Sequence, residues 1–505
     1  MRAPPPALPG RPPLAPAPGP PAPRPRQSHA FLWTCLAVLL GGVALLPVAL
    51  SPAAADRYYL AMVLTILTAV PLLVRALSGN LDLFEPIIPI SLLIGLTFGV
   101  RTMYIAYNPN TLDPILNGAL PFDDFVDRAL LVALASYISL LAGYFVLGAP
   151  LRITPLGARF PTRVWPAQVR LQKAAVLVAL ALVGSALLGA TDRDSVTAST
   201  NIVGIIADLV QATACVLMLY AAAGDNRLWM HALAWGLLLP LAAWQSLALG
   251  AKAFILKFFY VVIAAKHYGR RRITLTTFGG AAIALILLVF PIVNTARDNP
   301  ERIPQLFQAF SPVEYSQLAL EGVLSRATGI DVLSLVMKYD VSDELGNKEA
   351  YAAIPVYAFV PRAIWRDKPV LDQGTRFGRL LLIPSFEGRV SVASFGMFHI
   401  GDLYVTFGVT GLMIGMCVLG VIYRILYKLF DPLHTQDLGI KFLYILILWS
   451  IVSGFESDIP SVWSNLLKSA AVLVAVKVWL NRGAPAITPH HRPIAGIRQP
   501  FPVAR

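Results

Sequence analysis

Residues 402–423 decide the fold class of this chain, and they read DLYVTFGVTGLMIGMCVLGVIY. Asp402 is the only charged residue among them. A hydrocarbon layer about 30 Å thick requires about 20 apolar residues in a helix that rises 1.5 Å per residue. This stretch therefore predicts a membrane-spanning helix.

The composition extends that prediction to the whole chain. Hydrophobic residues make up 56% of the 505 residues, charged residues only 14%, and the mean hydropathy is +0.66. A water-soluble protein needs roughly a quarter of its residues charged, so an assembly of soluble domains is excluded. The three cysteines, Cys35, Cys215 and Cys417, all lie in apolar runs. The sequence therefore offers neither a disulfide framework nor a cysteine-based zinc site.

Further apolar runs predict an all-α, polytopic membrane protein with about twelve transmembrane helices. Most of the runs reach the required length, while the eighth and eleventh are short. The predicted spans are 30–50, 58–76, 86–106, 128–148, 171–190, 201–223, 228–249, 252–267, 274–292, 402–423, 440–455 and 461–480.

The basic residues orient these spans. Loops after even-numbered spans carry clusters such as Arg270–Arg272, whereas the short loops on the other side hold only Arg57, Arg101, Arg128, Arg193 and Lys252. Cytoplasmic loops are enriched in Lys and Arg, so we expect both termini in the cytoplasm of a bacterial cell, with the spans in its inner membrane. This placement explains the net charge of +13 better than binding to nucleic acid does.

The two ends of the chain are predicted to be tails. Residues 1–29 contain twelve prolines and four arginines, a composition typical of a disordered segment. The first span ends near a Ser51–Ala55 stretch that resembles a signal-peptidase site, but its apolar run is longer than that of a cleaved signal. We therefore expect a retained signal anchor, and a second cytoplasmic tail over 481–505.

One loop is much longer than the others. This loop comprises residues 293–401. It lies between spans one to nine (30–292) and spans ten to twelve (402–480), and it carries eleven Lys/Arg and twelve Asp/Glu residues. The charge rule places this loop on the outer, periplasmic face, and so long a loop is usually functional. Its periodicity predicts a helix over Pro312–Tyr339. The apolar run Tyr351–Val360 is expected to lie on the membrane surface or to dip into it.

Cations in this loop are candidates for binding a diphosphate. The stretch PRAIWRDKP at 361–369 contains Arg362 and Lys368, and Arg376 and Arg379 follow it. A guanidinium group binds phosphate oxygens in a bidentate manner, and lysine acts as a point charge. Trp365 can lie at the level of the lipid headgroups or stack on a sugar ring. The alternative is an interfacial segment whose cations contact lipid headgroups.

Polar residues within the spans are a second set of candidates, since each is costly in a bilayer. Lys252 is expected to face the same side as the large loop. Lys257, farther into the eighth span, either faces a cavity or extends to the headgroups. Ser461, Asn465 and Lys468 share one face of the last span, so that face lines a cavity or packs against another polar helix.

Proton transfer needs a titratable group near the membrane edge. The candidates are Glu321, Asp331, Glu387, His399 and Asp402. The ordinary pKa of histidine suits a base near neutral pH. Motifs for nucleotide binding, zinc hydrolysis and serine hydrolysis are absent from the sequence, so no metal and no cofactor is predicted.

Two motifs then give a family resemblance. The outer loop holds PRxxWxxKP at 361–369, and GxLYxxFG at 401–408 leads into the next span. With a dozen spans and one long late loop, this arrangement resembles the oligosaccharide repeat-unit polymerases, the Wzy-type O-antigen polymerase group. The stretch Gly250–Lys252 is similar to the Gly-Ser-Arg of that group, with Lys in place of Arg, and Arg326 matches an arginine upstream in its loop. The resemblance covers about 240–480.

The resemblance implies an inverting membrane glycosyltransferase of the GT-C type. Its substrates would be oligosaccharide repeat units linked to undecaprenyl diphosphate, and its partners membrane lipid, a chain-length regulator and a flippase. Such an enzyme needs cations for the leaving diphosphate and one base for the acceptor hydroxyl. The expected catalytic residues are His399 and Glu387. The expected substrate-binding residues are Arg326, Arg362, Trp365, Lys368, Arg376, Arg379 and Lys252.

Other functions remain open. An O-antigen ligase would use the same donor with a different acceptor. A lipid-linked oligosaccharide transporter or flippase is disfavoured, because no internal repeat is evident in the hydropathy and transport does not need the long loop. An assembly subunit without chemistry is a further possibility. A polyprenyl-monophosphate-sugar transferase is disfavoured because the first outer loop is short, although Asp123 and Asp124 lie in the second.

Overall fold

All residues that the structure describes belong to one unit, residues 47–505. The predicted tail 1–29 and the first predicted span, 30–50, lie outside the described residues. The computed structural model describes residues 52–79, 81–107, 123–159, 162–163, 167–189, 200–222, 228–248, 253–269, 272–298, 311, 315, 319–320, 322–324, 327–360, 364–365, 373–380, 396–482 and 486–487.

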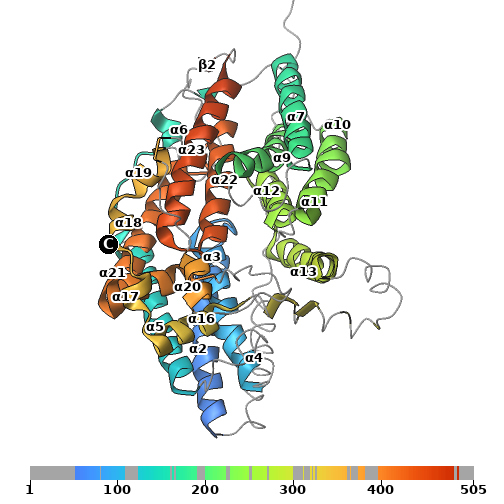
Figure 1. Cartoon of the computed structure of the whole chain (residues 1–505). Coiled ribbons are helices and arrows are strands. Elements are labelled where there is room, and N and C mark those ends of the chain that lie inside the picture. The colour runs from blue at the N-terminus through green and yellow to red at the C-terminus, as the bar shows by residue number, and fades with distance from the viewer. Residues whose placement is uncertain are drawn as a thin grey trace, which may run out of the picture. The chain divides into compact units, whose positions relative to one another are not determined.

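Helices make up almost all the regular structure of these residues (Figure 1). In the part before the large loop they are α2 (Pro52–Leu77), α3 (Ile87–Ile94), η2 (Gly95–Val100), α4 (Arg101–Tyr107), α5 (Asp123–Leu141), η3 (Ala142–Leu147), α6 (Leu156–Arg159), α7 (Ala167–Gly189), α9 (Thr200–Tyr220), α10 (Leu228–Leu233), η5 (Ala234–Leu238), α11 (Leu239–Ala248), α12 (Ala253–Gly269) and α13 (Leu275–Asp298). In the large loop and after it they are α16 (Gly329–Tyr339), α17 (Ser342–Leu345), α18 (Lys348–Ala352), α19 (Ile354–Phe359), α20 (Gln373–Leu380), α21 (Phe398–Phe430), α22 (Leu438–Gly454) and α23 (Ile459–Asn481).

Several of these helices suit a membrane. Five stretches are long and apolar enough to cross one: Ala55–Leu77, Ile87–Tyr107, Phe125–Leu147, Phe398–Phe430 and Ile459–Asn481. Shorter apolar helices, such as Leu438–Gly454, add to them. The chain is therefore helical with several helices suited to a membrane, as predicted. The count of twelve crossings stays a prediction, and so does the identity of the membrane.

Close backbone contact holds two of the long helices together. A Cβ atom built on Gly143, in η3, would lie 1.9 Å from the carbonyl oxygen of Cys417, and one built on Gly420 would lie 2.2 Å from the carbonyl oxygen of Leu140. Only residues without a side chain let the backbones approach so closely, which is how helices commonly associate in membranes. The α5–η3 helix therefore packs directly on α21.

Two large apolar clusters form the core of the described part. The first joins α7, α9, α11, α12 and α22, and the second joins α2, α3, α5, α16 and α21. A smaller cluster, which includes Val332, Leu335 and Phe377, holds α16, α17 and α20 of the large loop together. The loop is thus fastened to the helical core through α16, which contributes to two of the clusters.

The helix α21 is broken at Gly408. This residue has φ 68° and ψ −171°, a conformation that glycine adopts at little cost. A Cβ atom on Gly415 would lie 2.7 Å from Cδ2 of Leu403, so residues 398–407 fold back along the helix that follows Gly408. The predicted span 402–423 therefore starts too early. Asp402 belongs to the buried segment that folds back, and the continuous helix runs from after Gly408 to Phe430.

Loops predicted to lie on the same side of the membrane contact one another. On the predicted outer side, Nε of Arg57 pairs with Oδ1 of Asp127 at 2.7 Å, and the backbone N–H of Phe398 donates to the carbonyl of Glu456 at 3.0 Å. On the predicted cytoplasmic side, Nζ of Lys428 donates to the carbonyl of Ala149 at 2.6 Å. This grouping agrees with the predicted order of crossings, and the assignment of each side to a compartment stays a prediction.

The large loop and the C-terminal tail differ in detail from the sequence prediction. The helix predicted over Pro312–Tyr339 is interrupted before Gly329, where α16 begins after Thr328, a residue with a non-helical φ of −83° and ψ of 18°. The α19 part of the run Tyr351–Val360 packs along α23 (Figure 1). Outside the helices, the described residues contain one antiparallel ladder of two residues on each strand, β1 (Thr162–Arg163) with β2 (Ala486–Ile487).

Candidate functional site

The buried carboxyl group of Asp402 is the centre of the candidate site. Its side chain is fully buried, and Oδ2 accepts hydrogen bonds from the phenol of Tyr351 at 2.5 Å and from the backbone N–H of Ile459 at 2.8 Å. The side chain of Gln373 lies close enough to interact with the Asp402 carboxyl group. Within the described part of the chain, Oδ1 of Asp402 has no hydrogen-bond partner. One carboxylate oxygen is thus held in place while the other is free.

Local sequence signals position the two main donors. Asn347 caps α18 by accepting the N–H of Ala350 at 3.1 Å, which orders the short helix that carries Tyr351. Asp458 caps α23 by accepting the N–H of Ser461 at 2.9 Å. The first N–H groups of a helix lack partners inside it, and Ile459 therefore donates to Asp402. Asp402 thus receives one donor from the large loop and one from the start of a long helix.

Tyr351 remains a donor in this arrangement. Burial raises the pKa of the Tyr351 phenol well above its usual range, and the neighbouring carboxyl group of Asp402 raises it further. Both effects disfavour the phenolate, because it would be a second negative charge out of water. The phenol therefore keeps its proton and fixes the orientation of Asp402.

His399, the predicted base, lies beside Asp402. The two residues are three apart on one helical segment, so they share a face. The ring is buried, and its Nδ1 lies 2.9 Å from the carbonyl oxygen of Ser457. A carbonyl oxygen only accepts hydrogen bonds, so Nδ1 carries a proton and Nε2 holds the lone pair of the neutral ring. Both His399 and Asp402 are thus attached to the turn that precedes α23.

The helix α20 brings two of the predicted cations to this site. Gln373, its first residue, is buried and lies close to the Asp402 carboxyl group. Arg376 and Arg379 lie on the exposed face of the same helix, and Nη2 of Arg376 donates to the carbonyl of Glu344 at 2.7 Å. Phe377 of α20 packs with Met397 and Val405, so α20 lies beside the segment that contains Asp402, with its two arginines on the side that faces away from this packing.

Trp365 packs within the loop. Its ring stacks on that of Tyr357, with centroids 5.5 Å apart and planes inclined by 19°. Tyr357 is buried and Trp365 is half-buried. The expected role of Trp365 in stacking on a sugar stays a prediction, and one side of its ring already contacts Tyr357.

Five of the predicted site residues cannot be placed. Glu387, Arg326, Arg362, Lys368 and Lys252 all lie outside the described residues. Of the predicted set, the structure places His399 beside Asp402 and places Arg376 and Arg379 on the exposed face of α20, and it adds Asp402, Tyr351 and Gln373 to the candidates. Asp402 was among the proton-transfer candidates in the sequence, whereas no local signal distinguishes Tyr351 or Gln373 from other loop residues.

Asp331, another proton-transfer candidate, has a different position. Its carboxylate accepts hydrogen bonds from Nε and Nη2 of Arg101 at 3.1 and 3.3 Å. Both side chains are completely buried. This pair joins α4 to α16 and so anchors the large loop to the helical core. Asp331 is therefore an anchor rather than a free base.

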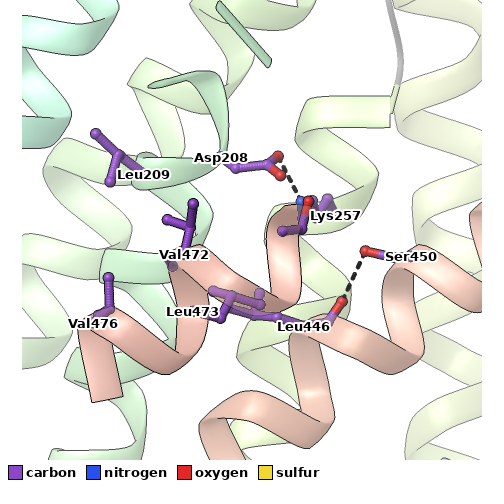
Figure 2. A pocket seen from close by; sticks show the side chains of 10 residues that line it. Asp208, Leu209, Lys257, Leu446, Ser450, Val472, Leu473 and Val476 are labelled. Atoms are coloured by element: carbon purple, nitrogen blue, oxygen red, sulfur yellow. Dashed lines mark hydrogen bonds and ion pairs between the residues drawn. The ribbon is translucent and has the colours of Figure 1, made fainter. Parts of the chain in front are cut away.

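Of the two alternatives for Lys257, a cavity or the lipid headgroups, the structure favours the cavity. Nζ of Lys257, in α12, pairs with Oδ1 of Asp208, in α9, at 2.5 Å. The two residues line a groove between helices, where they point toward each other (Figure 2). Lys257 therefore has a counter-charge on a neighbouring helix, at the wall of this groove.

A second polar cluster lies away from the site. Glu85 accepts hydrogen bonds from Arg75 at 2.6 Å, Arg424 at 3.0 Å and Tyr144 at 2.7 Å. The neighbouring carboxylate of Asp82 accepts from the phenol of Tyr427 at 2.8 Å. This network connects the segments predicted to be cytoplasmic, and no sequence prediction covered it. The sequence indicates it only through Asp82 and Glu85, two acidic residues in the short loop between the predicted spans 58–76 and 86–106.

Neither a metal site nor a relative identifies the chemistry. In the residues that the structure describes, no group of three or more His, Cys, Asp or Glu side chains could hold a metal ion. Comparison with family models, with curated proteins and with solved structures found no match to this chain. The candidate function therefore depends on the residues themselves.

Proposed function

We propose that the protein is a membrane glycosyltransferase of the GT-C type that polymerises oligosaccharide repeat units linked to undecaprenyl diphosphate, at the outer face of a bacterial inner membrane. One observation carries the proposal. Asp402, whose Oδ1 has no hydrogen-bond partner among the described residues, lies in the segment 398–407. Phe377 of α20, the helix that bears Arg376 and Arg379, packs against Met397 and Val405 of the same region. A potential base and potential phosphate-binding cations thus lie on neighbouring segments.

The location of this site suits an amphipathic substrate. Asp402 precedes a helix long enough to cross a membrane, and it receives a hydrogen bond from the first residue of another such helix, Ile459 of α23. A sugar linked to a lipid diphosphate must react where the membrane meets water. A carboxyl group at the end of two apolar helices, under a polar loop, fits that requirement.

The reaction needs two kinds of group. An acceptor hydroxyl forms a bond to the anomeric carbon of the growing chain while the bond between that carbon and the diphosphate breaks. The proton of the hydroxyl passes to a base, and the diphosphate leaves with the electron pair. Asp402 and His399 are the bases among the described residues, and Glu387 is the candidate outside them. Arg376 and Arg379, with Arg362, Lys368, Arg326 and Lys252, would stabilise the charge of the leaving diphosphate.

Deletion of the protein tests this function through the glycan ladder on the cell surface. A ladder reduced to single repeat units is the expected result. Long chains that remain on the lipid carrier would indicate a ligase, and units trapped inside the cell would indicate a flippase. Labelling of single cysteines at positions 343 and 483, in a background without Cys35, Cys215 and Cys417, tests the orientation. Position 343 should react from outside the cell and position 483 only after the membrane is opened.

A further inference from the structure

The ion pair between Lys257 and Asp208 lies in a groove formed by four helices. The groove runs between α9, α12, α22 and α23 and is open on one side. Ser450 and Ser469 are the other polar residues of its lining, and the remainder is aliphatic, including Leu446, Leu473 and Val476. Figure 2 shows the pair and the aliphatic side chains on different helices around one space.

Polarity changes along this groove. Lys257 follows the start of α12 by four residues, and Ser450 precedes the end of α22 by four residues. At 1.5 Å per residue, each of these residues lies about 6 Å from the end of its helix. Val476 follows the start of α23 by seventeen residues, or about 26 Å. The end of α22 and the start of α23 are joined by the turn 455–458. The charged end of the groove is thus near this turn, and the aliphatic end is deep among the helices.

The two partners of the ion pair differ in exposure. The Lys257 side chain is 9% exposed, whereas that of Asp208 is 43% exposed. A buried ammonium group needs a counter-charge, but the exposed carboxylate can be hydrated. Another anion can therefore replace Asp208 on Lys257 without leaving either charge buried and unpaired.

We propose that this groove binds a polyprenyl lipid with a phosphate head, whose phosphate replaces Asp208 on Lys257 and whose apolar chain lies along Leu446, Leu473 and Val476. The direction of the polarity gradient matches a lipid with its head near the turn 455–458. The identity of the lipid rests on the proposed function. A polymerase of lipid-linked repeats binds two polyprenyl diphosphates, a donor and an acceptor. The arginines of the loop would bind the donor diphosphate, whose bond to the sugar breaks, so the groove is assigned to the acceptor lipid.

Opposite effects of the two partners provide the test. Binding of undecaprenyl phosphate to the purified, detergent-solubilised protein is measured by competition with a fluorescent polyprenyl phosphate. Lys257→Gln should weaken binding at least tenfold, and Lys257→Arg should keep it within about threefold, because the charge remains. Asp208→Asn should leave binding unchanged or strengthen it, because the competing carboxylate is gone. Equal loss of affinity in Lys257→Gln and Asp208→Asn, or no loss in a folded Lys257→Gln variant, would overturn the proposal.

A second pair of variants covers the case in which Lys257→Gln does not fold. Leu473→Trp fills the aliphatic end of the groove and should also weaken binding at least tenfold. Val474→Trp is its control, because the neighbouring Val474 is 47% exposed and is not part of the groove lining. If both tryptophan variants bind lipid as the wild type does, the chain does not lie in this groove and the proposal is wrong.

Competitors identify the lipid. Undecaprenol, which has no phosphate, should compete at least tenfold more weakly than undecaprenyl phosphate, and so should phosphatidylglycerol. Equal competition by either lipid contradicts the assignment.

The experiments also distinguish failure of the groove proposal from failure of the proposed function. Lipid binding that needs Lys257, in a protein whose deletion leaves the glycan ladder unchanged, supports the groove and rejects the polymerase. A ladder lost on deletion but normal in a folded Lys257→Gln variant that binds lipid rejects the groove alone.

Discussion

The phenol of Tyr351 donates a hydrogen bond of 2.5 Å to Oδ2 of Asp402, across 51 residues of chain. Tyr351 belongs to the short helix α18 of the large loop, and Asp402 to the segment that folds back before the long part of α21. This one bond therefore fixes the loop on the helical core at the point where the candidate base lies. The other oxygen of Asp402, Oδ1, is buried without a hydrogen-bond partner among the described residues.

We expect Asp402→Asn to lower the polymerisation rate about 100- to 10,000-fold, the usual contribution of a general base. The amide keeps the size of the side chain but cannot take up the proton. Tyr351→Phe should lower the rate less, because the base remains and only its orientation is loosened. Glycan ladders, normalised to the amount of protein in the membrane, measure both effects. Asp343→Asn, which changes an exposed acid of the same loop, is the control, and a normal ladder from Asp402→Asn would transfer the role to His399 or Glu387.

The arginines of α20 should act on the transition state more than on folding. Arg376 and Arg379 are exposed, so solvent screens their charges, and loss of one charge-assisted contact to the leaving diphosphate should lower the rate by roughly tenfold or more. Arg376→Ala and Arg379→Ala should therefore reach the membrane at normal level and give shortened or no polymer, and Arg362→Ala and Lys368→Ala should do the same. Arg379→Lys should rescue poorly, because an ammonium group cannot make a bidentate contact. Lys348→Ala, which removes an exposed cation of the same loop, should give wild-type chain length.

Removal of one partner of the buried Arg101–Asp331 pair should destabilise the protein more than removal of both partners. Arg101→Met leaves the carboxylate of Asp331 buried without its counter-charge and should lower the free energy of unfolding by about 3–5 kcal/mol. The double variant Arg101→Met/Asp331→Leu should regain most of this loss, because no charge then remains buried. Thermal unfolding in detergent and a double-mutant cycle measure the coupling. Arg57→Met provides the contrast, since its partner Asp127 is half exposed and such pairs contribute about 1 kcal/mol or less.

Gly408→Ala should destabilise the protein and reduce polymerisation together. A side chain at a positive φ costs about 1–2 kcal/mol, and any relief of that strain straightens the chain and moves Asp402 away from Ile459. Gly401→Ala is the matched control, because Gly401 is helical and a Cβ atom there meets nothing within 4 Å. Thermal midpoints and glycan ladders of the two variants test this, and equal behaviour of both would mean that the break at Gly408 does not position the site.

Polymerisation should need no divalent metal. The leaving diphosphate can be stabilised by the cations of the loop, and the sequence shows no set of acidic and histidine residues with the spacing of metal ligands. Turnover by purified protein in excess EDTA should equal turnover without it. Activity that is lost in EDTA and restored by magnesium would contradict the prediction.

The sequence by itself determined that this chain is helical and suited to a membrane. A hydrocarbon layer acts on each run of about 20 residues separately, so the apolar runs coincide with helices such as α2, α7 and α23 wherever the structure describes them. It also pointed to Lys257, Asp331, His399 and Asp402 as candidates, whereas Glu85 and Asp208 were found only in the structure. Apolar runs and ionisable side chains are local properties, and they need no knowledge of the fold.

Only the tertiary structure decided which of these residues meet. Arg101 and Asp331 are 230 residues apart, and Lys257 and Asp208 are 49 apart, and nothing local relates the members of either pair. The sequence likewise does not predict that the chain folds back at Gly408, because glycine is compatible with both a continuous and a broken helix. A buried charge or a free carboxylate oxygen depends on how distant helices pack around it, and packing is a property of the whole chain. Asp402 became the centre of the site for that reason.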